Sequence, residues 1–134
     1  MKKEYTILIA DRNPHVREFL KREMTVAGYR VRLAENSRQV IKWAFHYEPV
    51  DLLILDPDLP DTEESSLLIN LQDRVPPLPV VFHTFLSNYD EASAILKSAD
   101  FVEKQGNSVE SLKQIVCNIL QSPIARSAQP ADQE

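Results

Sequence analysis

Polar side chains end four of the apolar runs in this sequence. Asp11 follows Ile7–Ala10, Asp56 follows Leu52–Leu55, Thr84 closes Val80–Thr84, and Lys104 closes Asp100–Lys104. A carboxylate can attack phosphorus as a nucleophile, a hydroxyl can donate to a phosphoryl oxygen, and an ammonium group can offset the phosphoryl charge. Asp56, Thr84 and Lys104 are the candidates for these three tasks. The set predicts a pocket that holds a phosphoryl group.

Such a pocket requires that the ends of these runs lie side by side. Apolar runs typical of strands alternate with segments of helical periodicity along the chain. We predict strands at Ile7–Ala10, Tyr29–Ala34, Leu52–Leu55, Val80–Thr84 and Asp100–Lys104, and helices at about 14–27, 37–45, 64–73, 90–97 and 107–120. Repeated β-α units indicate an α/β fold, a doubly wound five-stranded parallel sheet with helices on both faces. In such sheets the functional site lies beyond the carboxyl ends of the strands.

Local signals support several of these boundaries. Asn13 and Pro14 are typical of an N-cap and the first helical position, and Gly28 is typical of a helix C-terminus. Asn107 and Glu110 have the spacing of a capping box. We expect His83 to be a core histidine with its polar atoms bonded, and Cys117 to pack on the apolar side of the last helix.

Length and composition exclude several classes of protein. The 134 residues suffice for one domain, expected over residues 1–121, and the aperiodic segment 122–134 is predicted to be a disordered tail or a truncated linker. The net charge of -5 argues against nucleic-acid binding by this domain, and two glycines are too few for a P-loop or a dinucleotide-binding fingerprint. No apolar run is long enough to span a membrane. We expect a cytoplasmic protein.

The sequence resembles the receiver domains of two-component response regulators from about Tyr5 to Leu120. The resemblance rests on Ile7–Asp11 with Asn13-Pro14, Asp51–Asp56 with Leu59-Pro60, Pro79–Val81 with Thr84, and Ala99–Lys104. It implies a CheY-like, flavodoxin-like fold with strand order 2-1-3-4-5. It also implies that Asp56 is the phosphoacceptor, that Thr84 and Lys104 are the phosphoryl-binding switch pair, and that Phe101 stands at the aromatic switch position.

The resemblance further implies a signalling role and not an enzyme. A sensor histidine kinase or a phosphotransfer protein would supply the phosphoryl group to Asp56. A downstream effector, or a dimer partner, would bind the surface formed by the predicted strand Asp100–Lys104 and the helices before and after it.

One residue departs from the family in the acidic pocket. Receiver domains usually have a second acidic residue after the first strand, which holds Mg²⁺ together with the equivalents of Asp11, Asp56 and the backbone carbonyl of Asp58; this chain has Arg12 instead. Arginine removes an oxygen ligand and repels the cation. We therefore expect a weak or absent Mg²⁺ site at Asp11, Asp56 and Asp58, with Arg12 reaching into the metal position. Alternatively, Arg12 points to solvent and Asp58 completes a working site.

Two other functions remain open from the sequence. With Arg12 in the pocket, the domain could be a pseudo-receiver that docks partners without phosphorylation. The segment Asp56-Pro57-Asp58 also fits the first motif of haloacid-dehalogenase-like phosphatases, although that motif normally lies near the N-terminus of those enzymes. A further departure is Phe85, which follows Thr84 where the family usually has a small residue and is expected to narrow access to Asp56.

Overall fold

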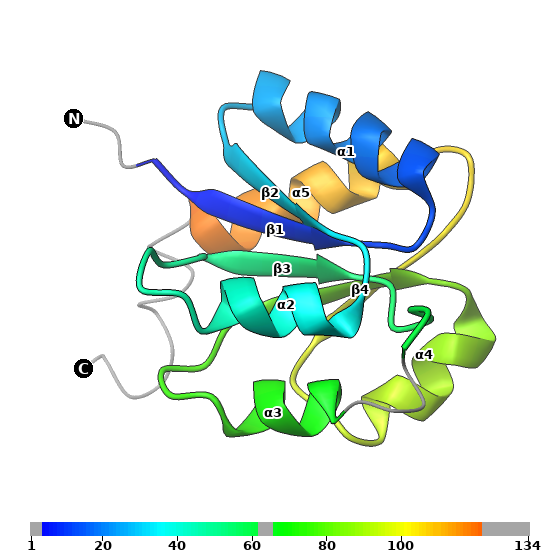
Figure 1. The fold of residues 1–134 in the computed structure, drawn as a ribbon. Helices are drawn as coiled ribbons and strands as arrows, with labels where there is room; N and C mark the ends of the chain where they lie inside the picture. Colours follow the sequence, from blue (N-terminus) through cyan, green and yellow to red (C-terminus); the bar gives the residue numbers. More distant parts are fainter. Residues whose placement is uncertain (1–3, 62–65, 122–134) are drawn as a thin grey trace, which may run out of the picture.

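The computed structural model describes residues 4–61 and 66–121. Strands and helices alternate along these residues (Figure 1). The strands are β1 (Thr6–Ala10), β2 (Arg30–Ala34), β3 (Leu52–Leu55), β4 (Val80–Thr84) and β5 (Asp100–Glu103). The helices are α1 (Pro14–Val26), α2 (Ser37–Ala44), α3 (Leu67–Asp73), α4 (Leu86–Ser93) and α5 (Ser108–Leu120).

The strands form one parallel sheet in the order β2-β1-β3-β4-β5. The predicted doubly wound sheet and its strand order are therefore confirmed. Strand β1 lies inside the sheet, where Ile9 pairs with Leu33 on one side and Ile54 on the other. Because strand order reverses between β1 and β3, the crevice at their carboxyl ends is the expected place for a site.

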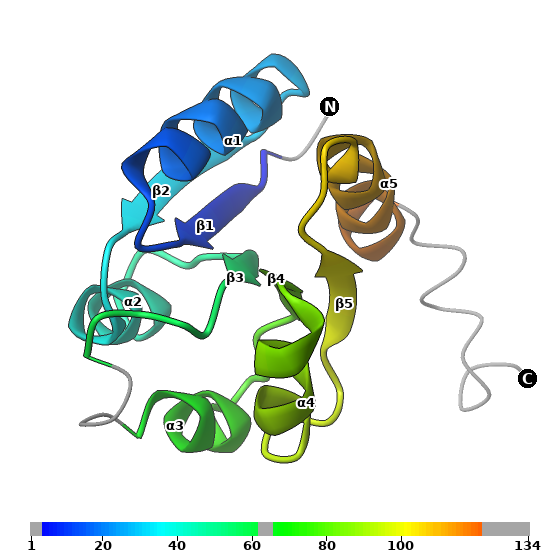
Figure 2. The ribbon, with the colours of Figure 1, turned by 90° about the vertical axis from the view of Figure 1, so that its right-hand side faces the viewer.

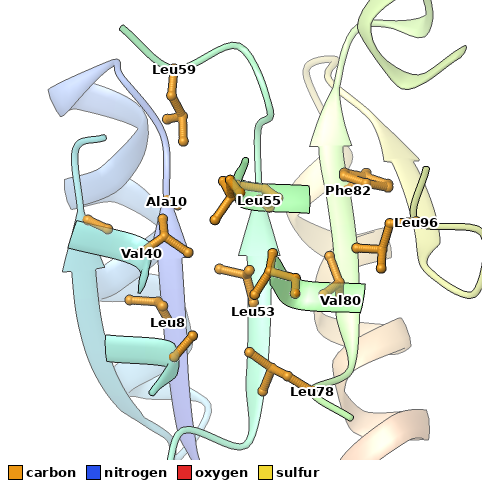
Figure 3. Close-up of a cluster of buried hydrophobic side chains, with 14 of the residues drawn as sticks. Leu8, Ala10, Val40, Leu53, Leu55, Leu59, Leu78, Val80, Phe82 and Leu96 are labelled. Carbon is orange, nitrogen blue, oxygen red and sulfur yellow. The ribbon is translucent and has the colours of Figure 1, made fainter. Parts of the chain in front are cut away.

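Each face of the sheet carries its own apolar core. Helices α1 and α5 lie on one side and α2, α3 and α4 on the other (Figure 2). Successive strand residues point to opposite faces, so Leu53 joins the core under α2, α3 and α4 while Ile54 joins the core under α1 and α5. Figure 3 shows the first of these cores, with Leu53, Leu55 and Phe82 from neighbouring strands. Burial on both faces explains why the central strands are almost continuously apolar.

The predicted ends of α1 are confirmed. Asn13 Oδ1 accepts hydrogen bonds from the backbone N–H groups of His15 at 2.9 Å and Val16 at 3.4 Å, and Pro14 is the first helical residue. Gly28 follows the helix with φ of +105°, a conformation that favours glycine because other residues carry a Cβ atom. These signals fix where the chain leaves β1 and where it returns to β2.

Three local predictions were wrong. Helix α4 begins at Leu86, four residues earlier than predicted, and ends at Ser93, so Leu96 packs into the core from the turn that follows the helix. The Asn107 side chain makes no capping hydrogen bond at α5, and the expected capping box is absent there. Cys117 is exposed, because the buried stripe of α5 runs through Leu112, Val116 and Leu120 instead.

Two predictions concern residues outside the described part of the chain. The expected start of α3 at residue 64 and the expected tail 122–134 both fall there. Within the described residues, no helix is long and apolar enough to cross a membrane.

Candidate functional site

The fold brings the four strand-end residues Asp11, Asp56, Thr84 and Lys104 together. Backbone hydrogen bonds continue past the strand ends and hold these residues in register: Asp56 N–H donates to the Ala10 carbonyl at 2.9 Å, and Lys104 N–H donates to the Thr84 carbonyl at 2.9 Å. Adjacent parallel strands thus place a carboxylate, a hydroxyl and an ammonium at one edge of the sheet.

Asp56 lies at the centre of this group. Its Oδ1 accepts a hydrogen bond from the Thr84 hydroxyl at 2.8 Å and another from the Asp58 backbone N–H at 2.9 Å. Its Oδ2 accepts a hydrogen bond from Lys104 Nζ at 2.7 Å. Asp56 is only 4% exposed, so these charged and polar partners replace the water that an isolated carboxylate would need.

Lys104 binds two carboxylates at once. Its Nζ lies 2.7 Å from Asp56 Oδ2 and 2.8 Å from Asp11 Oδ2, and Asp11 is buried as well. Burial by itself would lower the pKa of Lys104, but the hydrogen bonds and charges of Asp11 and Asp56 outweigh it and raise that pKa above the ordinary value. Lys104 therefore stays protonated at neutral pH and neutralises one of the two buried negative charges.

Arg12 reaches across to the loop after β3. Its Nε donates to the Asp58 backbone carbonyl at 3.0 Å, and its Nη2 lies 3.3 Å from Asp58 Oδ1. The ion pair of Asp56 is with Lys104, whereas Arg12 pairs with Asp58. Both Arg12 and Asp58 have about half of their side chains exposed.

The groups expected to hold Mg²⁺ are contacted by cationic side chains in this structure. Mg²⁺ takes a near-octahedral shell of oxygen ligands. The Asp56 and Asp11 carboxylates hold the Lys104 ammonium between them, and the Asp58 carbonyl accepts from Arg12. Across residues 4–61 and 66–121, no three His, Cys, Asp or Glu side chains are grouped in a way that could hold a metal.

Several neighbours of the site were missed by the sequence analysis. Asn88 Nδ2 donates to Thr84 Oγ1 at 3.3 Å, and Arg17 Nη1 donates to the Asp11 backbone carbonyl at 2.8 Å. Asn88 lies four residues after Thr84, one helical turn along the chain. That spacing would have identified Asn88 only if α4 had been predicted to begin at Leu86.

Two aromatic residues flank the site. Phe101, on β5, is partly buried and stacks on Tyr89 with 4.1 Å between ring centroids. Phe85 is 56% exposed, and its ring centroid lies 5.7 Å from Lys104 Nζ. Phe85 therefore stands beside the cation of the site.

His83 lies on β4 beside Thr84 and is buried. Its Nε2 is 2.9 Å from Ser108 Oγ, the first residue of α5, whereas Nδ1 has no hydrogen-bond partner among the described residues. The expectation of a core histidine with both ring nitrogens bonded is therefore met at Nε2 alone. Burial, followed by the Lys104 charge, lowers the pKa of His83 to about 4, so the imidazole is neutral at physiological pH.

Comparison with known proteins agrees with this geometry. A model of the response regulator receiver domain matches residues 7–116. The chain belongs to the response regulator receiver family. A DNA-binding transcriptional regulator NtrC from Bradyrhizobium sp. (strain RP501 Parasponia) is 30% identical over 131 residues, which cover 95% of this chain and 26% of the relative. The chain thus spans about a quarter of that relative's length.

Solved structures of receiver proteins share the fold. Response regulator protein TrrA from Thermotoga maritima, in complex with Mg²⁺–BeF, is 29% identical with a TM-score of 0.74, covering 87% of this chain and 99% of TrrA. TrrA has also been solved in complex with the histidine kinase ThkA, with a TM-score of 0.73 at 29% identity, covering 87% of this chain and 98% of TrrA. Receiver domains are in general signalling modules and not enzymes.

Proposed function

We propose that this receiver domain accepts a phosphoryl group on Asp56 from a phosphohistidine of a sensor histidine kinase or phosphotransfer protein. The observation that carries the proposal is the set of contacts on Asp56, with the Thr84 hydroxyl on one carboxylate oxygen and the Lys104 ammonium on the other. The complex of TrrA with a histidine kinase supports the choice of donor.

The reaction is an exchange of bonds at phosphorus. One Asp56 carboxylate oxygen forms the new P–O bond as the P–N bond to the donor imidazole breaks, and the imidazole leaves with the electron pair of that bond. Lys104 offsets the charge that gathers on the phosphoryl oxygens, and Thr84 donates a hydrogen bond to one of them. The product carries more negative charge than the carboxylate did, and this charge is the signal.

We propose that phosphorylation changes the surface formed by α4, β5 and α5, and that this surface binds the effector or dimer partner. Thr84 and Lys104 lie at the carboxyl ends of β4 and β5, so a change in their contacts falls at the start of the elements that follow these strands. Phe101, on β5, is the aromatic residue that would change position with them.

We assign Arg12 the role of excluding Mg²⁺ from the pocket, which makes phosphotransfer slow. The Arg12 guanidinium already binds the Asp58 carbonyl, and Lys104 already bridges Asp11 and Asp56. A divalent cation would have to displace both contacts and would meet the guanidinium charge.

A second candidate function is a docking module that works without phosphorylation. The Arg12–Asp58 contact favours it, because this contact ties the end of β1 to the loop after β3 in the unmodified protein. In this case the unmodified α4, β5 and α5 surface is the one that partners recognise.

Acetyl phosphate separates the two candidates. The protein is incubated with acetyl phosphate and Mg²⁺, and its intact mass is followed with time. We expect slow addition of one phosphoryl group in the wild type, faster addition in Arg12→Asp, and none in Asp56→Asn. No mass increase in the wild type after prolonged incubation, together with a clear increase in Arg12→Asp, would favour the docking module.

A phosphatase assay tests the remaining enzyme hypothesis. A haloacid-dehalogenase-like enzyme would turn over a chromogenic phosphate ester with Asp56 as nucleophile. We expect no turnover above an Asp56→Asn control.

A further inference from the structure

The first turn of α4 contacts both residues that respond to Asp56 in the proposed mechanism. Asn88 Nδ2 lies 3.3 Å from Thr84 Oγ1. The next residue, Tyr89, stacks its ring on Phe101 with 4.1 Å between centroids and 20° between planes. Two consecutive side chains of one helix therefore join the site hydroxyl to the β5 aromatic residue.

The chemistry of the groups fixes the direction of the hydrogen bonds at Thr84. A hydroxyl has one hydrogen, and Thr84 gives it to Asp56 Oδ1 at 2.8 Å. The contact with Asn88 must then be donated by the Asn88 amide to a lone pair of the Thr84 oxygen. Asn88, Thr84 and Asp56 thus form a chain of hydrogen bonds in which each bond polarises the next.

The turn that carries these side chains is fixed to the end of β4. The backbone N–H groups of Asn88 and Tyr89 both donate to the Phe85 carbonyl, at 3.0 and 3.1 Å. Phe85 directly follows Thr84, so little chain separates the hydroxyl from the turn. A displacement of Thr84 would therefore also displace the first turn of α4.

Tyr89 also contacts a second aromatic residue, Phe82, in the core. Its ring meets Phe82 edge-on at 6.0 Å, and Phe82 pairs with Phe101 across β4 and β5. Phe82 is fully buried, whereas Phe101 and Tyr89 are partly exposed. The stack therefore runs from the core to the surface beside α4.

We propose that Asn88 and Tyr89 are positioning residues that couple the Thr84 hydroxyl to Phe101 through the first turn of α4. The proposal rests on the proposed function, because Asp56 must acquire a phosphoryl group for the coupling to carry a signal. When the Thr84 hydroxyl turns to a phosphoryl oxygen, the hydrogen bond from Asn88 changes, the first turn of α4 shifts, and the Tyr89–Phe101 stack shifts with it.

The coupling is tested in the unphosphorylated protein by hydrogen–deuterium exchange of the α4 amides. Thr84→Val removes the hydroxyl with little change in volume, and Asn88→Ala removes the amide. We expect each variant to speed exchange in α4 by roughly two- to tenfold, the range for loss of one hydrogen bond, while β1 amides stay unchanged. The double variant should exchange no faster than either single variant. Effects that multiply, or an unchanged α4, would overturn the proposal.

The coupling from Thr84 to Phe101 is tested by the NMR resonances of the Phe101 ring. Thr84→Val should shift them in the wild-type background and leave them unmoved in Asn88→Ala or Tyr89→Leu. Tyr89→Phe, which keeps the stack, should retain the response. A Phe101 shift that persists in Asn88→Ala would overturn the role of Asn88. These measurements need no phosphorylation, so a negative acetyl phosphate assay together with intact coupling would reject the proposed function alone.

Discussion

At the residue scale, the charge balance of the site depends on Lys104. Asp11 and Asp56 are 2% and 4% exposed, and both hold the same ammonium group. A buried charge without a partner is costly, whereas a compensated one is tolerated. Lys104 is therefore a structural cation of the resting protein as well as a proposed partner of the phosphoryl group.

We expect Lys104→Met to lower the free energy of unfolding by about 3 kcal/mol, because two buried carboxylates would face each other without a cation. Chemical denaturation at pH 7 measures the loss. Adding Asp56→Asn should recover part of it, since one of the two charges is then gone. An equal loss in the single and double variants would show that Lys104 matters for packing and not for charge.

The sequence predicted which residues meet at the site but not all of their contacts. Asp11, Asp56, Thr84 and Lys104 end strands of one parallel sheet, so strand order and register alone bring them together. The Arg12–Asp58 contact depends on the conformation of the loop after β3, about which apolar periodicity says nothing.

At the scale of elements, α4 shows why a helix boundary was misplaced. The apolar residues Ala92, Ala94, Ile95 and Leu96 suggested a helix at 90–97. The last three follow α4, and Leu96 reaches the core from beyond the end of the helix. The true start lacks a side-chain cap, since Phe85 occupies that position. Because no capping residue marks the start of α4, the sequence did not predict the turn that holds Asn88 and Tyr89.

The burial of His83 on β4 makes stability depend on pH. Folded His83 has a pKa of about 4, against an ordinary value of 6.5. Between these values the unfolded chain binds a proton at His83 and the folded protein does not, so the free energy of unfolding falls as the pH falls through this window. From pH 7 to pH 5 the loss from this group is about 2 kcal/mol.

Denaturation of wild type and His83→Gln at both pH values checks this prediction. The wild type should lose about 2 kcal/mol more than the variant on going from pH 7 to pH 5, because glutamine does not titrate. An NMR titration should place the His83 transition at about pH 4, far below the ordinary value of 6.5. An ordinary transition for His83 near neutral pH would contradict the burial argument.

At the scale of the whole molecule, one sheet separates two cores. Leu53 belongs to the core under α2, α3 and α4, and Leu112 belongs to the core under α1 and α5. Both side chains are fully buried. The site at the carboxyl edge rests on both cores, because the strands that carry its residues are packed on both faces.

We expect Leu53→Ala and Leu112→Ala each to lower the free energy of unfolding by about 2–5 kcal/mol. Since the sheet keeps the two side chains apart, the double variant should lose the sum of the single losses to within about 0.5 kcal/mol. Urea denaturation of the three variants measures this. A large departure from additivity would show that the two cores are coupled through the sheet.

The most direct test is whether Arg12 keeps Mg²⁺ out of the site. Isothermal titration calorimetry with Mg²⁺ is performed on wild type and on Arg12→Asp, which restores an acidic residue after Asp11. We expect no saturable binding in the wild type and clear binding in the variant, because Lys104 and Arg12 already hold the oxygens of Asp11, Asp56 and Asp58 that would bind the ion. Tight binding by the wild type, with a dissociation constant of tens of micromolar, would contradict a site from which Arg12 excludes the ion.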